Sequence, residues 1–299
     1  MNRQYAELLA TPVEWNEECL AALLQWEESE ILAQTSLALC TYGTVRILSA
    51  SSQADRTWTL HPPIAKGLNF GVEELPSNLH HIVNEQGTSV RKILDHDRAK
   101  VKQLFYDACE AVCTLAPMLF QSIRYLLRSF HVIRSNSPKI DVSFSVPSLP
   151  NSIFGSIPGF DDKEAVARLA ETIVHEVLHL QLTLVEKYCP IVRLDMETRY
   201  MISPWRNCPR PEISVIHGLF VFRTLEILWS QVNSTYSESL LSFANRRVSE
   251  IHHQLSSLKD KKFDSLTEFG QKILAGIFDE IVVNSAKPNQ PNYRSGLSV

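Results

Sequence analysis

Glycine is scarce in this chain, and the shortage limits the folds that the chain can adopt. The 299 residues include ten glycines, or about 3% where soluble proteins average about 7%. Glycine-rich phosphate loops and turn-dense all-β folds both need the backbone freedom that glycine supplies. The composition therefore favours a mainly helical protein, and the length allows one large domain or two small ones.

The charge of the chain gives no sign of a polyanionic partner. Lys and Arg number 29 against 33 Asp and Glu, for a net charge of -4, whereas proteins that bind nucleic acid usually carry a basic face. The first residues form no basic-then-apolar leader, and no run of about 18 apolar residues occurs. We therefore expect a cytoplasmic protein that binds neither nucleic acid nor a membrane.

The cysteines are expected to be free thiols. There are six in the chain, they are widely spaced, and no CxxC pair occurs, as is usual for a protein without a disulfide framework. Cys109 and Cys113 lie four residues apart in a helical pattern. We expect them to pack in the core rather than to form half of a metal site.

Apolar residues recur with helical spacing in much of the chain. The predicted helices cover about 14–40, 97–134, 162–188, 211–232, 237–259 and 265–283. Pro117 should kink or split the second of them. Residues 55–90 read as loops with short elements, and the polar residues 285–299 as a disordered tail. Capping-box spacing at Asp161 with Glu164, and at Ser265 with Glu268, predicts two helix starts.

The apolar period changes to two between residues 139 and 157, where Ile140, Val142, Phe144 and Val146 alternate with polar residues. Such alternation predicts a short β-hairpin, closed by a loop that contains Gly155 and Gly159. The predicted fold is therefore mainly α, a multi-helix single domain with a small β-hairpin insertion before the helix at 162–188. Its expected parts are a helical part at 1–135, a metal-binding part at 136–284 and the tail at 285–299.

The helix at 162–188 contains the motif His175-Glu176-Val177-Leu178-His179, which is an HExxH sequence. Residues four apart share one face of a helix, so the two imidazoles can bind one metal ion while Glu176 lies beside it as the candidate catalytic residue. The alternative is a pair of core histidines bonded to backbone carbonyls or carboxylates. Two adjacent buried imidazoles favour the metal, because each needs a polar partner.

The strongest candidate for a third metal ligand is His217, a polar residue in an otherwise apolar run. Its neighbour Gly218 would leave room beside a metal. The rivals for the third position are Glu186, Asp195, Glu197 and Glu212. Glu186 is the least suited of them, because it lies seven residues after His179 on the same helix.

Two metals fit such a ligand set. A zinc peptidase would use Glu176 as the general base for a metal-bound water, although the extended pattern HExxHxxGxxH is absent. Three histidines with open positions also suit non-haem Fe(II), which more often has a carboxylate as its third ligand.

Several segments between residues 140 and 232 together resemble the HExxH-type 2-oxoglutarate-dependent peptide β-hydroxylases, a family encoded with ribosomally synthesised, post-translationally modified peptides. The segments are Ser143–Pro150, Ala170-Glu171-Thr172 with the HExxH motif, Ser203-Pro204-Trp205-Arg206, Arg210-Pro211 and His217–Phe222. The resemblance implies that His175, His179 and His217 bind Fe(II), that 2-oxoglutarate is the cosubstrate, and that the partner is a precursor peptide hydroxylated at a β-carbon.

A 2-oxoglutarate enzyme must also bind the distal carboxylate of its cosubstrate, and a guanidinium group does this with two hydrogen bonds. Arg206 and Arg210 are the candidates, and Arg210 is preferred because it leads into the helix that carries His217. Glu176 would then be a partner of the metal or the substrate. The remaining alternatives are an HExxH zinc metallopeptidase and a non-catalytic peptide-binding scaffold in which the histidines are structural.

Overall fold

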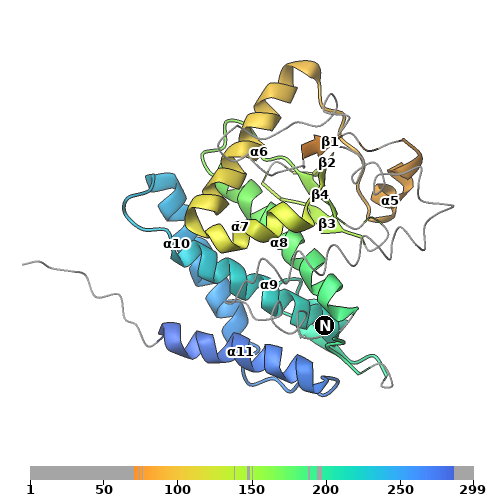
Figure 1. The fold of residues 1–299 in the computed structure, drawn as a ribbon, viewed down its shortest axis with the longest axis vertical. Helices are drawn as coiled ribbons and strands as arrows, with labels where there is room; N and C mark the ends of the chain where they lie inside the picture. Colours follow the sequence, from red (N-terminus) through yellow and green to blue (C-terminus); the bar gives the residue numbers. More distant parts are fainter. Residues whose placement is uncertain are drawn as a thin grey trace, which may run out of the picture.

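A computed structural model describes residues 71–285, except for residues 74, 76, 138, 147–148, 150, 188 and 194–196. Figure 1 shows the described chain with a small sheet, α6 and α7 in the upper half and α9, α10 and α11 in the lower half. The predicted helix at 14–40, the first part of the irregular region at 55–90, two of the cysteines and the predicted tail beyond residue 285 lie outside the described residues.

The described residues confirm a mainly α fold with a small sheet insertion. The helical elements are η2 (Ser77–Leu79), α5 (His80–Glu85), α6 (Asp95–Leu115), α7 (Pro117–Leu126), α8 (Ala165–Glu186), α9 (Glu212–Ser230), α10 (Glu238–Ser256) and α11 (Glu268–Ser285). The strands are β1 (Gly71–Glu73), β2 (Ser129–Ile133), β3 (Ser143–Ser145), β4 (Ser152–Ser156), β5 (Tyr200–Ser203) and β6 (Cys208–Pro211).

The helix predicted over 97–134 is right in its first part and wrong in its last. Pro117 splits it as expected and becomes the first residue of α7, a position where proline lacks no needed hydrogen bond. The helix prediction fails beyond Leu126, because Ser129–Ile133 form the fully buried strand β2. A short apolar run that is buried on both faces has no period to distinguish a strand from a helix.

The predicted hairpin forms, but it is part of a larger sheet. β3 and β4 pair antiparallel, with Phe144 opposite Phe154 and their rings stacked at 4.7 Å between centroids. β4 also pairs in parallel with β2, and β2 with β1, in the order β1-β2-β4-β3. Gly155 lies inside β4 rather than in a loop. Glycine suits this position because an added Cβ would come within 2.6 Å of the Phe130 ring.

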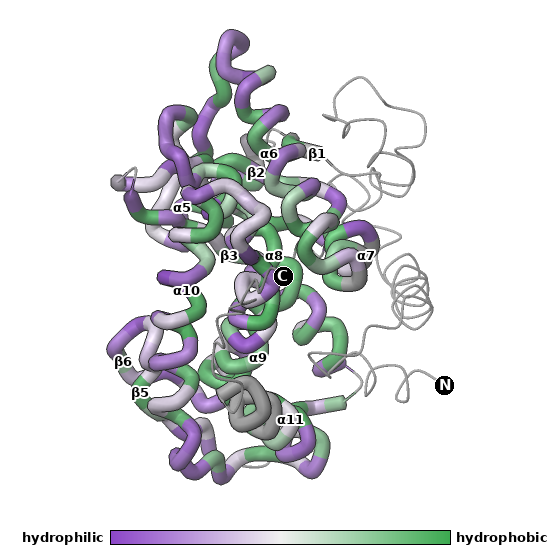
Figure 2. Tube along the Cα trace, turned by 90° about the vertical axis from the view of Figure 1, so that its left-hand side faces the viewer, coloured by the Kyte–Doolittle hydropathy of each residue, from purple (hydrophilic) through white to green (hydrophobic). Residues whose placement is uncertain are grey.

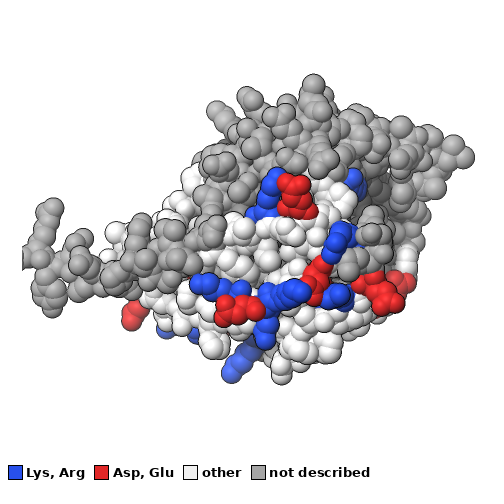
Figure 3. Space-filling view, turned by 90° about the horizontal axis from the view of Figure 1, so that it is seen from below, with Lys and Arg blue, Asp and Glu red and all other residues white. Residues whose placement is uncertain are grey.

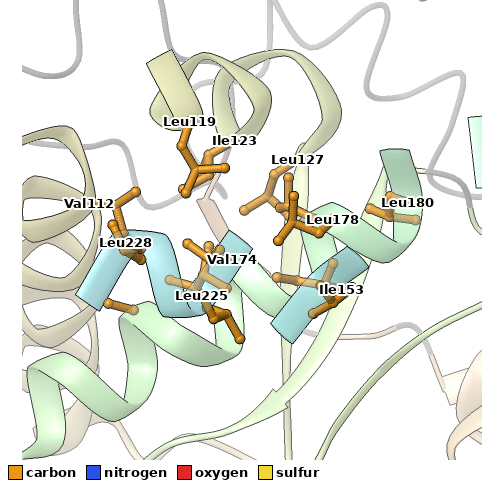
Figure 4. Close-up of a cluster of buried hydrophobic side chains, with 14 of the residues drawn as sticks. Val112, Leu119, Ile123, Leu127, Ile153, Val174, Leu178, Leu180, Leu225 and Leu228 are labelled. Carbon is orange, nitrogen blue, oxygen red and sulfur yellow. The ribbon is translucent and has the colours of Figure 1, made fainter. Parts of the chain in front are cut away.

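Helix α8 lies at the centre of the described fold. It packs against the sheet through β3 and β4, and against α6, α7 and α9. Figure 4 shows core side chains from these elements, including Val112, Ile123, Ile153, Val174 and Leu225, gathered into one cluster. Figure 2 shows long hydrophobic stretches of the trace in the interior, near the labels of α8 and α9.

Helix α9 is the one helix within the described residues whose length and composition would let it cross a membrane. Two-thirds of this apolar stretch of α9 is buried inside the protein, since α9 packs against α8, α10 and α11. Core helices of ordinary proteins have the same composition. The burial accounts for its apolar sequence.

The capping box predicted at Asp161 and Glu164 does not form, because Glu164 itself is the N-cap of α8 and no side chain caps it. In the turn before the helix, Asp162 accepts a hydrogen bond from the backbone N–H of Glu164 at 2.8 Å. Arg168 on the first turns of α8 pairs with Asp162 and also with Asp141 beside the hairpin. These contacts tie the sheet insertion to the helix that carries HExxH.

Charged side chains of both signs are intermixed on the face shown in Figure 3. Ion pairs such as Lys272 with Glu268 and Lys262 with Asp264 form between neighbouring groups. On the described part of this face, therefore, no broad patch of one sign is present.

Two glycines of α11 offer a matched test of packing. A Cβ at Gly270 would lie 2.2 Å from the carbonyl oxygen of Ile191, which is held in place by a hydrogen bond from Thr267. Thr267, rather than Ser265, also caps this helix by accepting from the Gly270 N–H at 3.1 Å. A Cβ at Gly276 would meet nothing within 4 Å.

We expect Gly270→Ala to lower the free energy of unfolding by about 1–3 kcal/mol, because the new methyl group must displace backbone. Gly276→Ala should raise it by about 0.5–1 kcal/mol, because alanine is the better helix former. Urea unfolding followed by circular dichroism measures both. Equal effects of the two substitutions would contradict the packing described for Gly270.

Candidate functional site

The three histidines predicted as metal ligands lie together between α8 and α9. His175 and His179 are one turn apart on α8, with their Nε2 atoms 3.2 Å apart. His217 projects from α9, and its ring is nearly parallel to that of His179, with 5.8 Å between centroids. The structure thus gathers the three imidazoles into one cluster, which we call the histidine cluster.

The distance between His175 and His179 suits two ligands of one ion. Nitrogens bonded to a metal at about 2.1 Å, with angles of about 90–109° between the bonds, are about 3.0–3.4 Å apart. The observed 3.2 Å lies in this range. Without an ion, the same distance is a hydrogen bond between one protonated and one unprotonated Nε2.

Burial keeps the two imidazoles of α8 neutral. Burial, together with the charges of Arg206 and Arg247, lowers the pKa of His175 to about 4. Burial also holds the pKa of His179 well below its ordinary value, with added repulsion from His175 and His217. Neutral imidazole is the form that binds a metal.

Glu186 is a partner of the third histidine. Its Oε2 lies 2.8 Å from the Nε2 of His217, because Glu186 follows His175 by eleven residues, or about three turns, and so shares its face of α8. Glu186 was expected to be the least suited of the candidate third ligands, and its eleven-residue spacing from His175 is the sequence signal that points to this contact. Metal-bound histidines commonly bond a carboxylate through the second ring nitrogen, which would leave Nδ1 of His217 for an ion.

In this conformation the described side chains do not form a complete three-ligand metal site. Among the residues that the structure describes, no three His, Cys, Asp or Glu side chains converge closely enough to hold a metal ion. The His175–His179 pair fits an ion, whereas His217 is engaged with Glu186. The structure therefore shows two imidazoles at a spacing that suits a metal ion, with a third imidazole beside them.

The structure describes two of the other candidates for the third metal ligand, Glu212 and Glu197. Glu212 is buried and accepts a hydrogen bond from the Ser265 N–H at 3.1 Å, and Glu197 is exposed. Asp195 falls outside the described residues. Another histidine of the chain, His252 on α10, bonds Glu226 of α9 at 2.8 Å.

Glu176 lies beside the histidine cluster in a buried position. Its Oε1 accepts a hydrogen bond from the Ser143 hydroxyl at 2.7 Å and lies 3.9 Å from the Nε2 of His175. Burial raises the pKa of Glu176 to about 7, while Ser143, Ser145 and Arg206 act in the opposite direction. The hairpin was predicted from the sequence, but the contact of its serines with Glu176 was not.

The two candidate arginines lie on the hairpin formed by β5 and β6. Arg206 is in the turn, and its charge acts on both His175 and Glu176. Arg210 is on β6, opposite Met201, and both arginines are exposed. The effect of its charge on His175 and Glu176 favours Arg206 over Arg210 as a group that acts at the cluster.

An aromatic wall closes one side of the cluster. The Trp205 ring stacks on Phe222 at 4.8 Å between centroids and an angle of 11°, and Phe222 meets the His175 ring edge-on at 5.3 Å. A Cβ at Gly218 would lie 2.6 Å from the indole of Trp205. The space beside Gly218 is thus occupied by Trp205, where sequence analysis had expected it to serve a metal.

No protein-family model matches the chain, and no curated protein matches it either. The functional interpretation therefore rests on the geometry of the site and on the resemblance described above.

The buried carboxyl of Glu176 gives a pH-dependent stability in the metal-free protein. Because its folded-state pKa is raised from 4.5 to about 7, its contribution is complete below pH 4.5 and is lost as the pH rises through 7. Glu176→Gln mimics the protonated form. We expect its stability relative to wild type to be about 1–3 kcal/mol more favourable at pH 8 than at pH 5.

Urea unfolding of chelator-treated protein at the two pH values measures this difference. The exposed Glu110 of α6 supplies the control, since Glu110→Gln should change stability equally at both pH values. If Glu176→Gln changes the free energy of unfolding by the same amount at pH 5 and at pH 8, the carboxyl of Glu176 is ionised in the folded protein at both pH values.

Proposed function

We propose that this protein is an Fe(II)- and 2-oxoglutarate-dependent oxygenase that hydroxylates a β-carbon of a ribosomally made precursor peptide. The observation that supports it most is the pair of neutral imidazoles, His175 and His179, with Nε2 atoms at 3.2 Å and His217 alongside. The family resemblance supplies the choice of iron, cosubstrate and substrate class.

The imidazoles of His175, His179 and His217 are chemically compatible with Fe(II) as the metal. Three imidazoles would leave positions on Fe(II) for a bidentate oxo acid and for dioxygen. The carboxylate of Glu186 bonds His217 and so can orient that imidazole. Bound iron would supply the activation of dioxygen that is coupled to decarboxylation of 2-oxoglutarate.

Arg206 is the proposed partner of the distal carboxylate of 2-oxoglutarate. It follows Trp205 in the turn of the β5–β6 hairpin, and its positive charge reaches the cluster. A guanidinium pairs with a carboxylate through two parallel hydrogen bonds. Arg210, on β6, remains the alternative.

The edge of the sheet offers a place for a peptide substrate. In the described residues β3 pairs only with β4, and the bond from the Ser156 N–H to the Val142 carbonyl sets the register. By alternation, the main-chain groups of Ser143 and Ser145 face away from β4. Their hydroxyls face Glu176, so an extended peptide added to this edge would pass beside the histidine cluster.

A zinc peptidase is the second candidate, and one observation favours it. The carboxylate of Glu176 lies 3.9 Å from the Nε2 of His175, where it could act as a base toward a metal-bound water. The oxygenase does not require Glu176 as a base. The effect of Glu176→Gln therefore separates the two functions.

We expect protein loaded with Fe(II) to convert 2-oxoglutarate to succinate in air and to add one oxygen atom to a precursor peptide encoded beside its gene. Mass spectrometry of the peptide and a succinate assay measure the two products. His175→Ala and His217→Ala should abolish both, whereas Glu176→Gln should retain them in part. Peptide cleavage that needs zinc but no 2-oxoglutarate, and that Glu176→Gln abolishes, would establish the peptidase instead.

Metal affinity gives a further test with its own control. Removing the carboxylate that orients His217, in Glu186→Gln, should weaken Fe(II) binding by about 10–100-fold. His252→Ala should leave it unchanged, because His252 bonds Glu226 away from the cluster. Anaerobic titration with Fe(II) measures both, and unchanged binding in Glu186→Gln would exclude His217 as a carboxylate-supported ligand.

A further inference from the structure

The indole N–H of Trp205 has no acceptor among the residues that the structure describes. Its Nε1 is buried, and no described atom lies at hydrogen-bonding distance and angle from it. A buried donor without an acceptor costs stability, and such groups in native proteins usually meet a water, an ion or a ligand. Trp229 shows the ordinary arrangement, because its Nε1 donates to Glu171 at 2.9 Å.

Packing alone does not explain why an indole occupies this place. The stacking of Trp205 on Phe222 uses only the ring face, which a phenylalanine would also offer. The indole meets Gly218 through its benzo edge, which is the edge opposite Nε1. Its face stacks on Phe222, which in turn meets the ring of His175. The unused donor therefore belongs to a ring that lies one aromatic side chain from the histidine cluster, and its N–H edge is turned away from Gly218.

The indole is also held firmly in that wall. Gly218 has no Cβ to displace it, and the turn that carries it is closed by a hydrogen bond from the Asn207 N–H to the Ser203 carbonyl at 2.8 Å. Asn207 adopts a left-handed φ of 49°, which asparagine tolerates better than most residues. A donor fixed in this way is suited to orient a ligand.

We propose that the indole N–H of Trp205 is a hydrogen-bond donor to the distal carboxylate of a 2-oxo dicarboxylate ligand, acting together with Arg206. A carboxylate has lone pairs for about four hydrogen bonds, so it accepts two from a guanidinium and still has room for a third from the indole. This inference rests on the proposed function, since it assigns a further binding residue for the same cosubstrate. Trp205 is thus a determinant of selectivity for an oxo acid that has a second carboxylate.

The test is calorimetric and needs no turnover. Anaerobic Fe(II)-loaded protein is titrated with 2-oxoglutarate and, separately, with pyruvate, which lacks the distal carboxylate. Trp205→Phe keeps the stacked ring and removes the N–H. We expect it to weaken 2-oxoglutarate binding by about tenfold or more and to change pyruvate binding by less than about twofold.

Trp229→Phe is the matched control, because it removes an indole N–H that bonds Glu171. It should alter stability but not affinity for either acid. If Trp205→Phe fails to fold, benzothienylalanine at position 205 replaces the N–H by sulfur in a ring of the same shape. In the wild type, NMR should show the indole N–H signal of Trp205 move on addition of 2-oxoglutarate.

The outcomes distinguish the two proposals. Wild-type affinity for 2-oxoglutarate in Trp205→Phe, or an indole signal that stays in place, overturns the role of Trp205 and leaves the oxygenase standing. Equal losses for 2-oxoglutarate and pyruvate overturn the assignment to the distal carboxylate. A wild-type protein that binds neither acid overturns the oxygenase and, with it, this inference.

Discussion

The burial of α8 is the constraint on which the rest of the described structure depends. A helix that packs against a sheet on one side and three helices on others is expected to be apolar all round, yet α8 carries His175, Glu176 and His179. Polar groups in such a position are costly unless they have partners. The neighbouring elements supply them: β3 provides Ser143 to Glu176, and α9 provides His217 beside His179.

The same burial sets the chemistry of the site. Loss of solvent lowers the pKa of His175 and His179 and raises that of Glu176, since a charged form is disfavoured away from water in each case. The imidazoles are therefore ready to bind a cation without first losing a proton. The burial of α8 therefore both stabilises the fold and keeps His175 and His179 in the neutral form.

The parts of this arrangement that are local in sequence were predictable, and the parts that depend on tertiary contacts were not. Periodicity located α8 to α11, and the HExxH spacing identified His175 and His179, because both patterns lie within one helix. β2 was mistaken for helix, since a short buried strand has no alternation.

The roles of Ser143, Glu186 and Trp205 were missed for a different reason. Each depends on a partner at least a dozen residues away, such as Glu176 for Ser143 and His217 for Glu186, and a single sequence does not show which distant residues meet. Glu186 shows the limit most clearly. Its place on α8 was known, but its partner lies on α9.

Charge balance connects the raised pKa of Glu176 with the choice between the two proposed activities. A divalent ion at the cluster would have the carboxylate of Glu186 and the cation of Arg206 nearby, and a bound 2-oxo dicarboxylate would add two negative charges. These charges cancel only if Glu176 is protonated. A buried site favours such cancellation, and burial raises the pKa of Glu176, which favours its protonated form when a dianionic cosubstrate is bound. A peptidase would instead use Glu176 as an ionised base beside the divalent ion, without a bound dianion. A carboxyl whose pKa lies near 7 can serve as that base as well, so the charge of the bound ligand, and not the raised pKa alone, separates the two activities.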